Sequence, residues 1–204
     1  MATKGELTRQ RVIETTAPVF NQRGYWGTSM RDLMHATGLE KGGIYNHFRN
    51  KDELAAAAFE HNVELMGERI RAALAGRRHA VDRLQAIGDV YRRFAVDAPF
   101  VGGCPIMNAA TEADDTHELL RHRAQDAMRR LRDDTIARIV ARGVERGELR
   151  PDVDPHSAAT IIVAILEGAL MLSHLYDDPS QVTVATAHLD GYVASLATAP
   201  GESQ

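Results

Sequence analysis

The sequence predicts an all-α protein of about nine helices, divided into a small N-terminal helical domain and a larger C-terminal one. Apolar residues recur at helical spacing along the chain, and no segment shows the alternation of apolar and polar residues that is typical of a half-buried strand. Aromatic residues, which favour strands, make up only 5% of the composition. Glycines and prolines divide the pattern into segments of helical length.

Three helices are expected within the first 54 residues. The first covers residues 8–23 and is stopped by Gly24, which can adopt a left-handed conformation. Thr28 is expected to cap the second helix, which ends before a turn at Gly38. A short third helix follows over about residues 41–48.

The remaining helices have clear start and stop signals. Asn50 is a good N-cap for a fourth helix, with Asp52 and Glu53 in its first turn. Gly147, Pro151 and Pro179 separate the later segments. The predicted helices cover about residues 51–74, 80–97, 106–113, 115–146, 155–176 and 180–196.

Composition indicates a chain with a substantial core in a reducing compartment. Hydrophobic residues make up 44% of the chain, and Cys104 is the single cysteine, so no intramolecular disulfide can form. The N-terminus lacks the apolar segment of a signal peptide. The longest apolar stretch, residues 158–175, contains Glu167 and His174, which favours a buried helix over a membrane span. We therefore expect a cytoplasmic protein without membrane attachment.

Charge is distributed unevenly along the chain. The net charge is −4, which does not by itself suggest a nucleic-acid partner. Residues 1–54, however, carry eight Lys and Arg against six Asp and Glu, whereas the rest carries sixteen against twenty-two. A positive net charge on the N-terminal part, with a negative net charge on the rest of the chain, is what is expected if the N-terminal part binds DNA.

The segment over residues 28–51, TSMRDLMHATGLEKGGIYNHFRNK, fits a helix-turn-helix. This motif needs a positioning helix, a tight turn and a short recognition helix that enters the major groove. Apolar residues of the second helix, among them Leu33, can meet Ile44 and Phe48 of the third, and Gly38 supplies the turn. The pattern predicts binding to double-stranded DNA through the helix over residues 41–47.

Polar residues of this segment can be assigned by position. Lys41 can reach a guanine edge or a phosphate, and Gly42 and Gly43 let the backbone approach the groove. Tyr45 and His47 can hydrogen-bond phosphates on either side of the groove. Several alternatives stay open at this stage: Tyr45 as a core aromatic, Asn46 as a flanking residue, and Lys41 and Lys51 as solvated surface charges.

Residues 8–55 resemble the DNA-binding domain of the tetracycline-repressor (TetR/AcrR) family of bacterial transcriptional regulators. The resemblance is carried by the run RGYWGTSM…ATGLEKGGIYNHFRNKDEL. It implies a DNA-binding domain over residues 1–54 and a ligand-binding and dimerisation domain over 55–204. It implies phosphate contacts from Thr28, Tyr45, His47 and Lys51, and base or groove contacts from Lys41, Gly42, Gly43 and Asn46. The sequence departs from the family pattern at two positions: Glu40 stands where the family often has a serine or threonine cap, and Gly43 stands where a threonine is common. The loss of the threonine hydroxyl reduces the direct contacts with bases expected from this helix.

The last two predicted helices carry more apolar surface than one subunit of this size needs. A helix that is apolar all round is buried on all sides, and the family resemblance implies a four-helix dimer interface. A twofold dimer would match a palindromic operator. The alternative is an ordinary monomer core. The residues expected at the interface are Ile161, Ile165, Leu166, Ala169, Leu172, Leu189, Tyr192 and Val193.

The resemblance also implies an effector pocket between the middle helices, whose occupation releases DNA. Methionines with a few polar groups suit an adaptable apolar pocket, although each of these residues also fits an ordinary core. Cys104 allows two interpretations, a redox or electrophile sensor and a small buried hydrophobe. The candidates are Phe94, Phe100, Cys104, Met107, Asn108, Glu112, Met128, Leu131, Leu170, Met171 and His174.

The sequence as a whole predicts a ligand-responsive, homodimeric transcriptional repressor. We find no phosphate-binding loop, nucleophile elbow or convincing metal set, so no enzyme, cofactor or metal is expected. The alternatives are a DNA-binding protein without ligand control, a redox sensor acting through Cys104, a nucleoid-type protein, and a carrier or enzyme with a vestigial DNA-binding domain.

Overall fold

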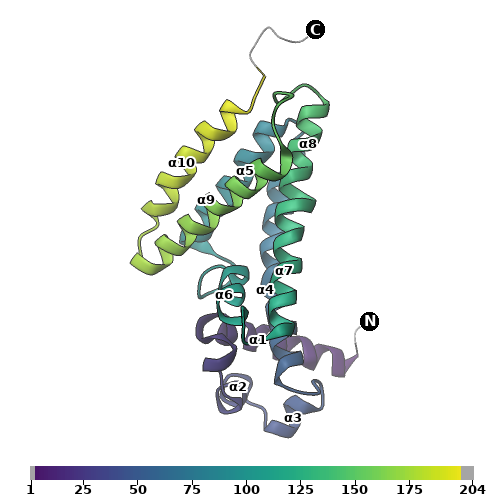
Figure 1. Ribbon diagram of the computed structural model, residues 1–204. Helices are drawn as coiled ribbons and strands as arrows, with labels where there is room; N and C mark the ends of the chain where they lie inside the picture. The colour runs from purple at the N-terminus through teal and green to yellow at the C-terminus, as the bar shows by residue number, and fades with distance from the viewer. Residues whose placement is uncertain (1–2, 199–204) are drawn as a thin grey trace. The chain divides into compact units, whose positions relative to one another are not determined.

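The computed structural model describes residues 3–198, and this part of the chain is helical throughout, with a single isolated bridge between Leu149 and Ala197 (Figure 1). Because α7, η1 and α8 form one continuous helix, the described residues contain nine helices, as the sequence predicts. Their bounds are α1 Lys4–Gly27, α2 Met30–Thr37, α3 Lys41–Tyr45, α4 Lys51–Leu74, α5 Ala80–Asp97, α6 Pro105–Ala113, α7 Glu118–Leu131, η1 Arg132–Ala137, α8 Arg138–Glu145, α9 Pro155–Tyr176 and α10 Ser180–Ser195.

Helix α1 is longer than predicted at both ends. It begins at a capping box formed by Thr3 and Glu6, in which each side chain binds the backbone N–H of the other residue. Gly24 does not end the helix but kinks it, with φ 72° and ψ 174°, and a further turn follows to Gly27. The N-cap of α2 is Ser29, which forms a capping box with Asp32, and not Thr28 as predicted.

The chain forms two compact units. The first contains the chain up to Met66 together with Pro99–Asp126, and the second contains Gly67–Ala98 and the chain from Ala127 onward. The domain boundary predicted between residues 54 and 55 lies inside α4, where the helix continues without interruption. The structure also groups α6, from the middle of the chain, with the N-terminal helices.

The core of the first unit is built around α1. Val12, Ile13 and Phe20 of α1 pack with Leu33 of α2 and with Leu54 of α4. The other buried residues of this core are Ala17, Ile44, Phe48, Ala55, Ala58, Ala113 and Leu120. Helix α6 contacts α1 directly, so its polar residues are available to bond the backbone of α1.

The second unit is a helical bundle of α5, η1, α8, α9 and α10. Figure 1 shows α9 and α10 as an antiparallel pair, and both contact α5. Tyr91 of α5 donates a hydrogen bond to Glu167 of α9 at 2.7 Å, and Arg92 pairs with Asp190 of α10 at 2.7 Å. These bonds satisfy polar groups that the apolar packing would otherwise leave without partners.

Helix α9 is long and apolar enough to cross a membrane by length and composition alone. Half of its most apolar window is buried inside the structure, however, as in the core helix of a globular protein. Its N-cap Asp154, which accepts a hydrogen bond from Ser157 N at 2.8 Å, and its first residue Pro155 are ordinary signals for the start of a helix. The helix therefore has one face in the core and one face exposed.

A π-helical turn, η1, joins α7 to α8 within the long helix that the sequence predicts over residues 115–146. Thr135 donates its hydroxyl hydrogen to Arg130 O, five residues earlier, at 2.9 Å. The turn accommodates one extra residue between the buried positions Leu131 and Ile136. As a result Leu131 and Ile136 lie on the same apolar face of the helix, although residues five positions apart lie on different faces of a regular α-helix.

Candidate nucleic-acid interface

Helices α2 and α3 form the predicted helix-turn-helix. Gly38, in the left-handed conformation with φ 67°, ends α2, and its N–H donates to Met34 O at 2.9 Å. Leu33 and Ile44 are fully buried where the two helices meet. Because α3 has only five residues, too few for a stable isolated helix, this packing is what holds its orientation.

The outer surface of α3 carries most of the predicted DNA-contact residues. Lys41, Gly42 and Asn46 are exposed, and Gly43, Tyr45 and His47 are partly exposed. A Cβ atom at Gly42 would meet nothing within 4 Å, so nothing inside the first unit requires a glycine there. The structure thus brings these residues together on one exposed surface, with a lysine at the N-terminal end of α3. Tyr45 is only partly buried, which excludes the core interpretation for its whole ring.

Thr28 and Lys51, predicted as phosphate contacts, lie at the junction between α1 and α2. The Thr28 side chain is buried, and its hydroxyl donates to Gly24 O at 2.6 Å. The Lys51 ammonium donates to Tyr25 O at 2.5 Å and lies 4.0 Å from the centre of the Tyr25 ring. Burial lowers the pKa of Lys51, partly offset by Glu112 and Asp52. Both side chains therefore have partners inside the first unit, and their contacts with phosphate remain a prediction.

A carboxylate from α6 holds the backbone just after the kink in α1. Glu112 accepts hydrogen bonds from Tyr25 N at 2.7 Å and from Trp26 N at 2.9 Å. These N–H groups begin a new helical turn and have no partner within it. At Gly24 a Cβ atom would lie 2.5 Å from both Glu112 oxygens, and φ is +72°. A glycine is thus required there for both its conformation and its small size.

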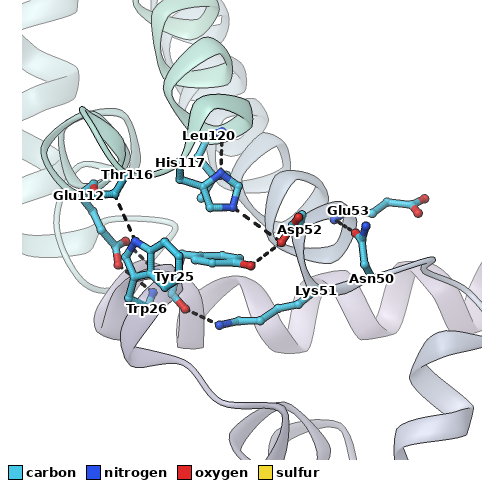
Figure 2. A network of polar contacts seen from close by, with 10 residues as sticks. All are labelled: Tyr25, Trp26, Asn50, Lys51, Asp52, Glu53, Glu112, Thr116, His117 and Leu120. Carbon is cyan, nitrogen blue, oxygen red and sulfur yellow. Dashed lines mark hydrogen bonds and ion pairs between the residues drawn. The ribbon is translucent and has the colours of Figure 1, made fainter.

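Further side chains surround this contact, and Figure 2 shows how they converge on Tyr25 and Trp26. The Tyr25 hydroxyl donates to Asp52 of α4, and His117 Nε2 lies 3.7 Å from the same carboxylate. The Trp26 indole N–H donates to Thr116 Oγ1 at 3.2 Å. We call Tyr25, Trp26, Lys51, Asp52, Glu112, Thr116 and His117 the junction network. It links α1, the start of α4 and the α6–α7 connection.

The electrostatics of this network centre on Tyr25. Burial raises the pKa of Tyr25 to about 12, and the hydrogen bond to Asp52 and the charge of Asp52 act in the same direction. Each of these effects disfavours the phenolate. Tyr25 therefore remains a hydrogen-bond donor to Asp52 across the physiological pH range.

Two predicted effector residues belong to the same region. Glu112 holds Tyr25 and Trp26, and Asn108 Nδ2 donates to Asn21 O at 3.1 Å and to Gly102 O at 2.6 Å. Both side chains thus bond the first unit's own backbone, a role that no sequence signal indicated because Tyr25 and Glu112 are 87 residues apart. Asn21, on the α1 side, was missed for the same reason.

The other predicted effector residues are divided between the two units. In the first unit, Phe100 and Cys104 are buried and Met107 is partly buried. Met171 and His174 are exposed on α9, so they do not line the interior of the second unit. The remaining candidates there are the buried Phe94, Leu131 and Leu170 and the partly buried Met128. No group of three metal-ligating side chains occurs among residues 3–198.

The predicted dimer residues also separate into two sets. Ile161 and Leu172 are exposed, and Ile165 and Tyr192 are partly exposed. The other four are at most 3% exposed and belong to the core of the subunit, so they have no surface to bury against a partner; these are Leu166, Ala169, Leu189 and Val193. Three further apolar side chains of the same two helices are exposed: Val184 of α10, and Leu175 and Tyr176 of α9, which were not predicted for the interface.

Comparison with known proteins agrees with this geometry. Residues 12–58 match the family model described as bacterial regulatory proteins, tetR family. Residues 80–189 match the tetracyclin repressor-like C-terminal domain. The chain belongs to the TetR family. The resemblance seen in the helix-turn-helix is thereby confirmed for most of the chain.

Solved structures of this family share the fold over nearly the whole chain. A TetR transcriptional regulator from Chloroflexus aurantiacus J-10-fl is 45% identical, with a TM-score of 0.91, and the match covers 95% of this chain and 98% of that one. A TetR-family regulator from Cytophaga hutchinsonii is 34% identical, with a TM-score of 0.89, covering 98% and 100%. AibR, solved in complex with isovaleryl coenzyme A and operator DNA, is 21% identical, and the match covers 93% of this chain and 99% of that one. Its TM-score of 0.70 shows a likeness of fold alone.

Replacing Glu112 with glutamine should destabilise the first unit. The amide keeps one acceptor oxygen, but its NH₂ group faces a backbone N–H, so one hydrogen bond is lost and the other is no longer charge-assisted. We expect a loss of roughly 1–3 kcal/mol in the free energy of unfolding. Urea unfolding followed by the fluorescence of Trp26, the single tryptophan, measures this change. The exposed Glu145→Gln is the matched control, and equal transition midpoints for the two variants would contradict the assignment.

Tyr25 should make stability depend on pH at the alkaline end. The folded-state pKa is about 12 and the ordinary value is 10.0, so the unfolded chain loses this proton first as pH rises. The contribution of Tyr25 is therefore complete below pH 10 and is lost between pH 10 and about pH 12. Unfolding free energies measured across this window should fall less steeply for Tyr25→Phe than for the wild type. If the unfolding free energies of Tyr25→Phe and the wild type fell equally steeply with pH, the Tyr25 phenol would not contribute to stability in this way.

Proposed function

We propose that this protein is a homodimeric transcriptional repressor that binds a palindromic operator through α3 and is released by a small-molecule effector. The observation that carries the proposal is the open face of α3, where exposed Lys41, Gly42 and Asn46 lie on a helix oriented by buried Leu33 and Ile44. A recognition helix needs both a rigid support and an unobstructed outer surface. The absence of a side chain at Gly42 lets the backbone come close to the groove.

Contacts with DNA divide between the groove and the phosphates. Lys41 reaches a guanine edge or a phosphate at the tip of α3, while Asn46 reads a base or flanks the groove. Tyr45 and His47, both partly exposed, donate to phosphates. Thr28 and Lys51 contribute by holding the junction on which α2 begins. Specificity rests on few side chains and so depends on the pairing of two half-sites.

Dimerisation is supported by an exposed apolar stripe on α9. Ile161, Ile165, Gly168, Leu172 and Leu175 follow one another at intervals of four and three residues, the spacing of a helix–helix seam. A Cβ atom at Gly168 would meet nothing within 4 Å, which leaves room for a neighbouring helix to come close. A contiguous exposed apolar surface is typical of an interaction site. A twofold partner on this stripe gives the symmetry that a palindromic operator requires.

Effector control is supported by the fold and by the regulatory names of the relatives. AibR shows that a protein of this fold can hold both a coenzyme A thioester and operator DNA. The match of residues 80–189 to a repressor-like C-terminal domain favours repression. We propose regulation in the cytoplasm without enzymatic activity. Cys104 is 4% exposed, which favours a small buried hydrophobe over a redox sensor.

Lys41→Ala should weaken binding to DNA from the region upstream of the protein's own gene. We expect a loss of roughly ten-fold, because the lysine lies at the tip of the helix that enters the groove. The slope of log affinity against log salt should fall by about 0.9 if the contact is to a phosphate and stay unchanged if it is to a base. Fluorescence anisotropy at several salt concentrations measures both quantities. Arg142→Ala, an exposed cation on α8, is the control, and equal affinities would refute this placement of α3.

Leu175→Glu should convert the dimer to a monomer. Leu175 is 68% exposed in the single chain and lies on the α9 stripe, so its replacement puts a charge in the proposed interface without disturbing the subunit core. Sedimentation velocity would show the change in mass, and operator affinity should fall with it. Val96→Glu, at a position on α5 that is 71% exposed, is the matched control. A dimer that persists in Leu175→Glu would refute this interface.

A further inference from the structure

The first unit contains a small cavity beside the junction network. It lies among α1, α4, α6 and the start of α7, and about 40 Å³ is open to the centres of water molecules. One water needs roughly 10–15 Å³ on the same measure, so the cavity admits a group of two to four non-hydrogen atoms. Its walls comprise apolar residues, mainly Phe20, Phe59, Pro105 and Leu120, together with Asn21, Asn62, Asn108 and Glu112.

The amide side chains of the cavity donate N–H groups to backbone carbonyls, and their oxygens are the acceptors that remain; Asn62 uses one of its two N–H groups in this way. Asn21 Nδ2 donates to Val101 O at 2.6 Å and to Gly103 O at 3.0 Å. Asn108 Nδ2 donates to Gly102 O at 2.6 Å and Asn62 Nδ2 to Ala17 O at 3.3 Å. These bonds to carbonyls fix which end of each amide is the oxygen. Asn62 is only 4% exposed, and among the described residues no donor reaches its Oδ1.

The charged group that lines the cavity is negative, and the nearby Lys51 ammonium, which interacts with Glu112, lies outside the lining. Glu112 is the one charged residue among the twelve that line it, and no lysine or arginine is among them. Each Glu112 oxygen accepts one backbone N–H and keeps a further lone pair. A small site with amide oxygens and a carboxylate is complementary to a cation with several N–H donors.

We propose that this cavity binds a small ammonium-type cation, of which methylammonium is the representative. Its three N–H groups match the acceptors of Asn62, Asn108 and Glu112, and its methyl group matches the rings of Phe20 and Phe59. Ordered water is the competing occupant, but water has two donors and no charge. The site lies within the first unit and includes Asn108 and Glu112, two of the residues predicted for effector binding, and its occupation links α1, α4 and α6.

The wild-type chain tests the proposal with three solutes at constant ionic strength. Methylammonium chloride should raise Tm and change Trp26 fluorescence with a saturable midpoint on the order of 10 mM, since two heavy atoms cannot bind much more tightly. At ten times the midpoint the rise in Tm should be about 3–5 °C. Tetramethylammonium chloride, which has the charge but no N–H, and urea, which has N–H groups but no charge, should give no saturable change. An equal response to either one would overturn the proposal.

Variants then locate the site. Ala109 lines the cavity, so Ala109→Leu should fill it and abolish the saturable response. Ala110→Leu adds the same group at the next, exposed position of α6 and should retain the response. Glu112→Gln keeps the shape and removes the charge, and should raise the midpoint at least ten-fold. An unchanged midpoint in Glu112→Gln, or a saturable response that persists in Ala109→Leu, would place the binding elsewhere and refute the site.

Discussion

The arrangement of the DNA-facing helices depends on one carboxylate, that of Glu112. The chain turns sharply at Gly24, and the turn exposes two backbone N–H groups that begin the next helical segment. Glu112 satisfies both from α6, which stands far away in sequence. Because buried or half-buried donors without partners are costly, this contact decides where residues 25–28 lie and hence where α2 can begin. Lys51 and Asp52 then attach the start of α4 to the same point.

The outer surface of α3 is therefore held in place by side chains that lie behind it, on α2 and in the junction network. Helix α3 has five residues and makes no side-chain cap of its own at Glu40. Its position comes from the burial of Ile44 against α2, and α2 in turn is fixed by its Ser29–Asp32 capping box and by Gly38. Side chains that a family resemblance assigns to phosphates, Thr28 and Lys51, are part of this support in the structure. The distinction matters because a supporting residue affects all operators equally, whereas a groove residue discriminates among them.

Local signals in the sequence predicted most of the fold. Asn50, Pro155 and the glycines between segments predict the ends of α4, α5 and α9 to within a residue or so, because capping and helix-breaking residues act on the few residues next to them. The observed cap of α2, Ser29, is adjacent to the predicted cap, Thr28, and the two residue types cap helices about equally well. The carboxylate of Asp32, three residues after Ser29, is the signal that distinguishes them. The hydrogen bonds of Glu112 and Asn108 to α1 were not predictable, because they join segments 87 residues apart and no spacing pattern in the sequence marks such pairs. An apolar interface on α9 was predicted, but the exposed Ile161 and Leu172 could not be separated from the buried Leu166 and Ala169, since hydropathy does not tell a core position from an interface position.

The π-helical turn between α7 and α8 has a consequence for how this chain tolerates changes in length. Buried positions run Ala127, Leu131, Ile136 and Val140, so one interval is five residues where a regular helix would have four or three. One residue corresponds to roughly 100° of rotation about a helix axis. Deleting Thr135 would place Ile136 four positions after Leu131, so an uninterrupted α-helix would keep Ile136 and Val140 in phase with Ala127 and Leu131. The chain should therefore tolerate the loss of one residue at this turn, whereas the same loss in a regular stretch of the helix would rotate every apolar side chain that follows away from the core.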